Sequence, residues 1–227
     1  ELEAWKIYNI NNDFNVAIIP QMTSNSSEKN EQVSFDLDTS IILQCNKTKK
    51  IFYNNVDNPV SLKDLKKLKK FVIKKFKQPI SITCFGVGAS SEYPHCFLNI
   101  NRKNEQKKII ENSLKKLEKI LEIIRPKIYF PAGGTYKIYG KFGNLNKFIA
   151  QPNFKQIIQM NKKKILFENL IGGGSIEINN KDKLNITKPI TNIGNHKNSI
   201  YLKKLYTEKY FYEKGKIVNN DKLRNLF

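Results

Sequence analysis

The stretch KKIFYNNVDNPVSLKDLKKLKKF, residues 49–71, contains a pattern from which the fold of this chain can be predicted. It opens on a short apolar, β-prone segment, passes through a polar loop that holds Asp57, and continues into a segment of helical periodicity. Ser61 is placed to cap that helix. Its apolar stripe consists of Leu62, Leu65, Leu68, Val72 and Phe76. The stretch therefore predicts a strand, a loop and an amphipathic helix with one apolar and one lysine-rich face.

Further strands and a long helix are expected on the two sides of this stretch. Three further strands are expected before it, over residues 15–20, 33–37 and 40–45, and the link 46–49 is short enough for a hairpin. After it come a strand over 79–86, a long helix that opens at Asn104 and stops at Pro126, and a strand over 127–134. This alternation predicts an α/β fold, a layered sheet with packed helices.

The remaining third of the chain continues with shorter elements. Short helices are expected over 144–150 and 153–160, strands over 164–170 and 175–180, and a helix over 199–214. We expect residues 1–160 to form the α/β core, itself incomplete, and residues 161–227 to complete or extend that domain.

Composition limits the classes of protein to which the chain can belong. With 227 residues, 40% of them hydrophobic, it can bury a substantial core. The sequence contains neither a run of about 18 apolar residues nor a basic-then-apolar leader, so no membrane span or secretory signal is predicted. The three cysteines are odd in number and lie in apolar surroundings, which favours a reducing, cytoplasmic compartment over a disulfide framework.

The net charge of +20 leaves two interpretations open. All basic residues except Arg102, Arg125 and Arg224 are lysines, and the chain is also rich in Asn and Ile, whose codons are A/T-rich. Genome composition can thus account for much of the lysine, which then forms a solvated coat. The other interpretation is a surface that binds nucleic acid or another polyanion. Because Arg is scarce, we expect such binding to be weak and independent of sequence.

Three loops follow expected strands, over residues 54–59, 86–96 and 131–136, where α/β folds gather their chemistry. Asp57 in the first loop is either a turn former beside a proline or a metal ligand or general base. In the second loop, Glu92, Tyr93 and His95 are candidates for lining a substrate pocket.

The segments KKIFYNNVDNP, ITCFGVGASSEYPHCF and RPKIYFPAGGTYKIYGK resemble the second half of a metallo-β-lactamase-fold hydrolase. Their sequence pattern most resembles that of the branch that contains CMP-N-acetylneuraminate hydroxylase. The resemblance covers residues 16–159. It implies the second half of an αββα sandwich and a small sugar-nucleotide or phosphorylated substrate. It also implies a divalent metal, zinc or iron, held by Asp57 in the complete protein, with Glu92, Tyr93, His95 and Tyr136 as substrate-binding residues.

The departures from this family are equally specific. Its metal motif, His-x-His-x-Asp-His, is absent, because the chain contains only His95 and His196. Where many members place a last histidine ligand, this sequence reads Ala132-Gly133-Gly134. A hydrolytic zinc site needs about three protein ligands. We therefore expect either further ligands upstream of Glu1 in a longer protein, or a scaffold that has lost its metal. A non-catalytic basic domain that binds polyanions is the alternative from another class.

Overall fold

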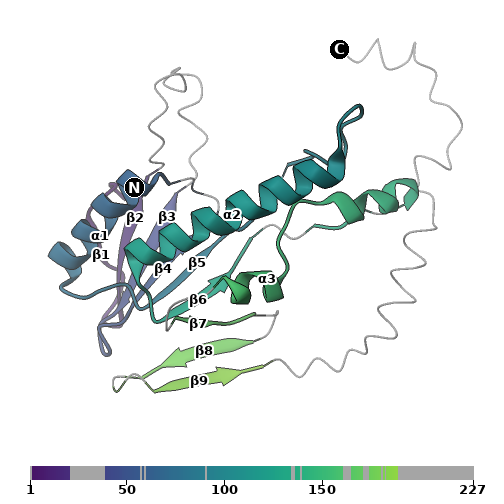
Figure 1. Ribbon diagram of the computed structural model, residues 1–227. Coiled ribbons are helices and arrows are strands. Elements are labelled where there is room, and N and C mark those ends of the chain that lie inside the picture. The colour runs from purple at the N-terminus through teal and green to yellow at the C-terminus, as the bar shows by residue number, and fades with distance from the viewer. Residues whose placement is uncertain are drawn as a thin grey trace, which may run out of the picture.

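A sheet of seven strands, arranged in the order of the chain, forms the centre of the computed structural model (Figure 1). The structure describes residues 2–20, 39–56, 58, 60–89, 91–133, 136–138, 140–160, 165–170, 174–179, 181 and 183–188. The strands of the sheet are β1 (Ile7–Asn9), β2 (Phe14–Ile19), β3 (Ser40–Cys45), β4 (Ile51–Asn55), β5 (Ile82–Phe85), β6 (Ile128–Pro131) and β7 (Leu166–Phe167).

The direction of pairing changes in the middle of the sheet. β1 to β4 pair antiparallel, whereas β4 to β7 pair parallel. Parallel neighbours need a crossover, and here α1 (Leu62–Phe76) joins β4 to β5 while α2 (Arg102–Ile124) joins β5 to β6. The two helices lie side by side on the same face of the sheet (Figure 1). The predicted α/β class is confirmed, and membership of the metallo-β-lactamase family stays a prediction.

Shorter elements follow β6. The 3-10 segment η3 (Gly140–Phe148) and the helix α3 (Phe154–Gln159) lead to β7, and a separate antiparallel hairpin is formed by β8 (Ser175–Ile178) and β9 (Leu184–Thr187). Among the described residues, none of the helices is both long enough and apolar enough to cross a membrane.

The helix face of the sheet carries the main core. One row across this face has a residue from each strand, in the order Ile7, Ala17, Ile42, Tyr53, Thr83, Tyr129 and Phe167. The five central members are fully buried against the apolar stripes of α1 and α2. Thr83, in the middle of the row, donates its hydroxyl hydrogen to the Tyr53 carbonyl at 3.0 Å. Burial of this row fixes which side of each strand faces the helices.

The second face of the sheet is equally apolar but less buried. Its matching row is Tyr8, Val16, Leu43, Phe52, Ile82, Ile128 and Leu166. Val16 and Ile128 are buried in this row, whereas the other five side chains are only partly so. The rings of Phe52 and Phe130 stack 6.1 Å apart on this face, across the intervening strand β5.

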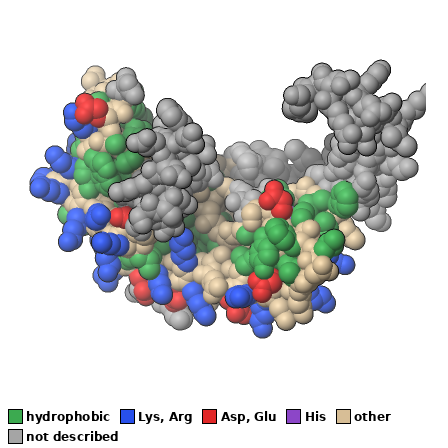
Figure 2. Space-filling model, turned by 90° about the horizontal axis from the view of Figure 1, so that it is seen from above, with side chains coloured by type: hydrophobic (Ala, Val, Ile, Leu, Met, Phe, Trp, Pro, Cys, Tyr) green, Lys and Arg blue, Asp and Glu red, His purple; other side chains and the backbone are tan. Residues whose placement is uncertain are grey.

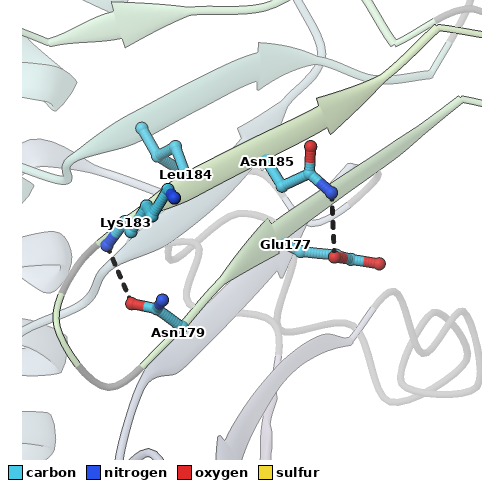
Figure 3. Close-up of a pocket in the computed structure, with 5 residues that line it drawn as sticks. All are labelled: Glu177, Asn179, Lys183, Leu184 and Asn185. Carbon is cyan, nitrogen blue, oxygen red and sulfur yellow. Dashed lines mark hydrogen bonds between the residues drawn. The ribbon is translucent and has the colours of Figure 1, made fainter.

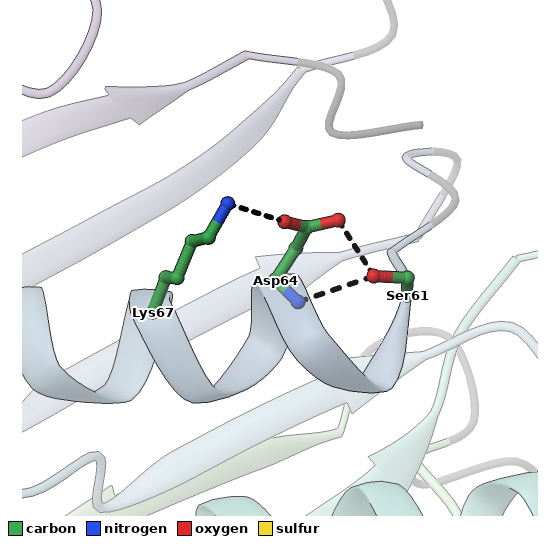
Figure 4. Close-up of polar contacts among 3 residues, drawn as sticks. All are labelled: Ser61, Asp64 and Lys67. Carbon is green, nitrogen blue, oxygen red and sulfur yellow. Dashed lines mark hydrogen bonds and ion pairs between the residues drawn. The ribbon is translucent and has the colours of Figure 1, made fainter. Parts of the chain in front are cut away.

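Helix α1 begins as the sequence predicts. Ser61 Oγ accepts the backbone N–H of Asp64 at 3.1 Å and donates to Asp64 Oδ2 at 2.6 Å (Figure 4). Lys67 Nζ lies 3.2 Å from Asp64 Oδ1. The pKa of Asp64 is held below its usual value, first by the Ser61 hydroxyl and then by Lys67. The cap and the negative charge in the first turn together define where the helix starts.

Several predicted boundaries differ from the structure. Helix α2 begins at Arg102, because the side chain of Asn101 accepts the N–H of Asn104 at 3.2 Å and is therefore the cap. Of the segment expected as a helix over 144–150, residues 144–148 form the end of η3. Strands β1 and β9 were not predicted. The strand expected over 33–37 and the helix expected over 199–214 lie outside the described residues.

Candidate functional site

The carboxyl ends of β4, β5 and β6 lie together, as parallel pairing of these strands predicts. Asn55 pairs with Phe85, and Phe85 pairs with Pro131. The loops that follow are in contact: a Cβ on Gly86 would lie 3.3 Å from the Val56 carbonyl oxygen and 3.6 Å from the carbonyl oxygen of Ala132. The three sequence-predicted loops thus begin at one place on the edge of the sheet.

Gly133 brings the third loop close to the first. Its φ of +85° is a conformation that L side chains rarely adopt, and a Cβ there would lie 2.5 Å from Val56 Cγ1. Ala132, one residue earlier, donates its N–H to the Phe85 carbonyl at 3.1 Å. Glycine is therefore required where the chain leaves β6 and passes the loop after β4.

The second loop is hydrogen-bonded to the segment that follows η3. Ala89 donates its N–H to the Ala150 carbonyl at 3.0 Å, and Gln151 Nε2 donates to the Ala89 carbonyl at 3.4 Å. Gly88, at a φ of +99°, allows this approach, because a Cβ there would lie 2.7 Å from the Ala150 oxygen. These contacts orient the part of the loop that carries the candidate residues.

His95 and Tyr136 are brought together from different loops. His95 is buried, with 2% of its surface exposed, and its ring centroid lies 5.6 Å from that of Tyr136. The Tyr136 hydroxyl donates to the Ser91 carbonyl at 2.9 Å, and its oxygen lies 3.4 Å from both ring nitrogens of His95. The second and third loops are thus joined through one tyrosine.

The surroundings favour a neutral imidazole at His95. Burial lowers the pKa of His95, the positive charge of Arg102 lowers it further, and the negative charge of Glu92 opposes both. Burial raises the pKa of Tyr136, with smaller contributions from Cys96 and Glu92. Glu92 is exposed, so its carboxylate reaches solvent while its charge acts on both partners. Three of the four predicted pocket residues therefore share one electrostatic environment.

Tyr93, the fourth predicted pocket residue, turns toward α2. Its hydroxyl donates to Glu105 Oε2 at 2.6 Å, and this hydrogen bond is the main reason that the pKa of Tyr93 is raised. Its ring meets that of Phe97 edge-on, with centroids 5.1 Å apart. In this position Tyr93 ties the loop to the helix.

Arg102 belongs to this site, although sequence reasoning did not select it. It is half-buried at the first turn of α2, and its Nε donates to the Phe97 carbonyl at 2.9 Å. The guanidinium carbon lies 5.6 Å from the ring centroid of Phe148, and Lys147 Nζ lies 5.1 Å from the same centroid. The sequence did contain a signal that could have identified Arg102: arginine is scarce in this chain, and Arg102 follows soon after the loop that carries His95.

A buried polar network holds the first loop. Asn58 Nδ2 donates to Ser40 Oγ at 2.8 Å and to the Pro20 carbonyl at 3.2 Å, and Ser40 Oγ donates to Asn55 Oδ1. Tyr53 adds a hydroxyl 3.4 Å from Ser40 Oγ. Asp57 itself lies outside the described residues. The network nevertheless holds residues on either side of it, Asn55 and Asn58.

The described residues do not fit a metal ion. Within them, no group of three or more His, Cys, Asp or Glu side chains is arranged to hold one. The buried Asn58 Oδ1 accepts no hydrogen bond in the described part of the chain, but a single amide oxygen does not form a hydrolytic metal site. In the described residues, the candidate site is thus a set of hydrogen-bonding and charged groups.

A hollow lies on the β8–β9 hairpin (Figure 3). It is lined by Glu177, Asn179, Lys183, Leu184 and Asn185. Asn185 Nδ2 donates to Glu177 Oε2 at 3.3 Å, and the backbone N–H of Lys183 donates to Asn179 Oδ1 at 2.9 Å. All five lining residues are exposed, so this hollow would enclose little of a bound molecule.

Comparison with known proteins gives only distant structural likenesses. No family model matches the chain, and no curated protein matches it. A crystal structure from Parabacteroides distasonis, described by inference as a metal-dependent hydrolase, matches with 13% sequence identity and a TM-score of 0.39. The match covers 74% of this chain and 56% of that one, so this chain spans little more than half of that protein. A likeness at this level carries no argument about function.

Proposed function

We propose that this chain forms a hydrolase-like domain that binds a small substrate at the carboxyl ends of β4, β5 and β6. The contact between the three loops at Gly86 carries the proposal. In open α/β sheets, ligands bind beyond the carboxyl ends of the strands, where loops from neighbouring strands meet. This chain has such an edge, with a buried histidine and an exposed carboxylate beside it.

His95 would act on the substrate in its neutral form. A histidine whose pKa is lowered by burial can accept a proton at neutral pH, which suits a general base. Tyr136 orients the ring, and its own hydroxyl is already oriented by the Ser91 carbonyl. Glu92 would accept hydrogen bonds from substrate hydroxyl groups.

The substrate we propose is a sugar nucleotide or another phosphorylated small molecule. Arg102 and Lys147 place two cations around the ring of Phe148, next to the loop that carries His95. Guanidinium and ammonium groups bind phosphate, and an aromatic ring offers a surface for a base or sugar. This arrangement supports the substrate class that the family resemblance implies.

We also propose that the complete protein binds a divalent metal, zinc or iron. Asp57, which lies outside the described residues, is the ligand that the resemblance assigns. Asp57→Asn should lower the metal content of the complete protein, measured by mass spectrometry of the metal, with little change in the free energy of unfolding. Unchanged metal content and turnover in that variant would leave Asp57 as a turn residue.

The substrate proposal is tested by calorimetric titration with a sugar nucleotide, the matching nucleoside monophosphate and the unphosphorylated sugar. We expect both phosphorylated compounds to bind, and Arg102→Gln to weaken them about tenfold, as the loss of one charged hydrogen bond would. Arg125→Gln is the matched control, because Arg125 caps the opposite end of α2. Absence of binding by both compounds, or equal loss in the control, would refute the proposal.

A second candidate function is the binding of polyanions by α1. This helix contains seven lysines and one acid, Asp64, and six of the lysines are exposed. Lys and Arg side chains gather on the left and along the lower edge of the view in Figure 2. Such a surface attracts any polyanion through the release of counterions. We propose it as weak binding that does not depend on sequence.

A further inference from the structure

Two polar side chains of helix α2, one helical turn apart, contact the end of η3. Arg102 lies in the first turn of α2 and Gln106 follows one turn later, so the two are neighbours on one face of the helix. The segment η3 lies beside this end of α2 (Figure 1). The guanidinium carbon of Arg102 lies 5.6 Å from the ring centroid of Phe148, the last residue of η3. Gln106 makes the second contact.

Gln106 holds the backbone on both sides of Phe148. Its Nε2 donates to the Lys147 carbonyl at 3.0 Å and to the Ile149 carbonyl at 2.9 Å. A side-chain amide has two N–H donors, so both are used here. Gln106 is half-buried and Ile149 is buried, which shields the second of these bonds from water. The phenylalanine is thus held to α2 through the residues before and after it.

These two bonds place a second cation near Arg102. Lys147 Nζ lies 5.1 Å from the ring centroid of Phe148, the ring that Arg102 also approaches. Arg102 is attached in turn to the loop that precedes α2, because its Nε donates to the Phe97 carbonyl at 2.9 Å. The two cations come from segments remote in sequence, and Gln106 joins those segments beside them.

The position of Lys147 depends on how its backbone is held. Its side chain is exposed, and a lysine has a flexible four-carbon stem, so the backbone sets the region that its charge can reach. Asn146 fixes the shape of the segment itself, because its Nδ2 donates to the carbonyls of Ile138 and Gly143 at 2.6 and 2.7 Å. Those bonds lie within the segment, whereas the bonds from Gln106 join it to α2.

From these contacts we propose that Gln106 is a positioning residue for the phosphate group of the substrate. By holding the backbone on both sides of Phe148, it keeps Lys147 within reach of a phosphate that Arg102 binds. This inference rests on the proposed function, which assigns phosphate recognition to these two cations. It adds that α2 supplies one cation directly and positions the other through a neutral side chain.

A double-mutant cycle tests this role, with calorimetric titration of a sugar nucleotide and of the matching nucleoside monophosphate. Gln106→Met removes both donors, keeps the length of the side chain and suits a helix. We expect it to weaken binding about tenfold, the effect of losing one charged contact. In a Lys147→Gln chain, Gln106→Met should cause no further loss, because the charge through which Gln106 acts is already absent. A purely structural role would give the same loss in both chains.

Gln159→Met on α3 is the matched control, since it removes the same amide at an exposed position and should leave the affinity unchanged. Circular dichroism checks that each variant is folded, and Gln106→Ala, which favours a helix, replaces Gln106→Met if that variant is not.

The outcomes separate this inference from the substrate proposal. Unchanged affinity after substitution of Gln106, or an equal loss with and without the charge of Lys147, overturns the positioning role while the substrate proposal stands. An equal loss in Gln159→Met also overturns it. If the wild-type chain binds neither phosphorylated compound, the substrate proposal fails and the positioning role fails with it.

Discussion

The hydroxyl oxygen of Tyr136 lies 3.4 Å from both ring nitrogens of His95, while its proton is donated to the Ser91 carbonyl. One side chain from the loop after β6 thus makes contacts at two points of the loop after β5. These two loops are connected by the long helix α2, so the contact joins segments that are far apart in the sequence. The geometry of the candidate site depends on this link.

Tyr136→Phe should therefore loosen the site while the ring contact is kept. Loss of the hydroxyl should reduce the free energy of unfolding by about 1 kcal/mol, the typical worth of one such hydrogen bond. Chemical denaturation measures this change. Tyr8→Phe is the control, because the Tyr8 hydroxyl accepts the N–H of Glu3, only five residues away in the chain, whereas Tyr136 joins two remote loops; it should have a smaller effect.

The buried His95 predicts that the protein loses stability in mild acid. Its pKa is lowered in the folded state, so the unfolded chain binds a proton first as the pH falls below about 6.5. The contribution of His95 is then fully present above that pH and declines as the pH falls toward the lowered folded pKa. Denaturation at a series of pH values should show this decline, and His95→Gln should reduce it. A folded-state pKa above 6.5 in a nuclear magnetic resonance titration would contradict the prediction.

The cap of α1 predicts a second effect at lower pH. Ser61→Ala should reduce the free energy of unfolding by about 1 kcal/mol, because the N–H of Asp64 loses its acceptor. Since the folded-state pKa of Asp64 is lowered, its carboxylate stabilises the fold above about pH 4, and this contribution disappears as the pH falls through the lowered value. Asp64→Asn should flatten that part of the pH profile. Glu111→Gln, which removes a more exposed carboxylate on α2, should alter it less.

Gly133 provides a test of the contact between the first and third loops. Gly133→Ala would place a methyl carbon 2.5 Å from Val56 Cγ1 and would force a positive φ on alanine. We expect a loss of about 1–3 kcal/mol of unfolding free energy, the usual range for a residue held in a strained conformation. Combining it with Val56→Ala should restore part of that loss, because the smaller side chain makes room. An absence of rescue would mean that backbone strain alone is responsible.

The lysines of α1 predict how the chain responds to nucleic acid. Fluorescence anisotropy with labelled duplexes of different sequence should show weak affinities that are alike and that fall as salt is raised. Replacing Lys66 and Lys70 by Glu should weaken binding more than replacing Lys137 and Lys155, which are equally exposed but lie away from α1. Tight binding that distinguishes one sequence from another would instead make polyanion recognition the main function.

The sequence by itself determined the α/β class and most elements of the sheet. Apolar residues at intervals of three and four set the inner side of α1, and Ser61 with Asp64 set its first turn. Crossover helices on either side of β5 made parallel pairing of β4, β5 and β6 predictable. The three loops could therefore be placed at one edge from local patterns alone.

Which side chains meet at that edge, by contrast, depends on the tertiary structure. His95 and Tyr136 were both selected from the sequence, but their contact depends on how two loops fold back over the strand ends. Tyr93 lies two residues before the same histidine in the chain, yet its hydroxyl donates to Glu105. A hydroxyl donates to whichever acceptor the packing brings close to it. Arg102 and the second face of the sheet went unnoticed for the same reason. Local periodicity predicts which face of an element is apolar. The partner that a side chain contacts depends instead on how segments remote in sequence pack together.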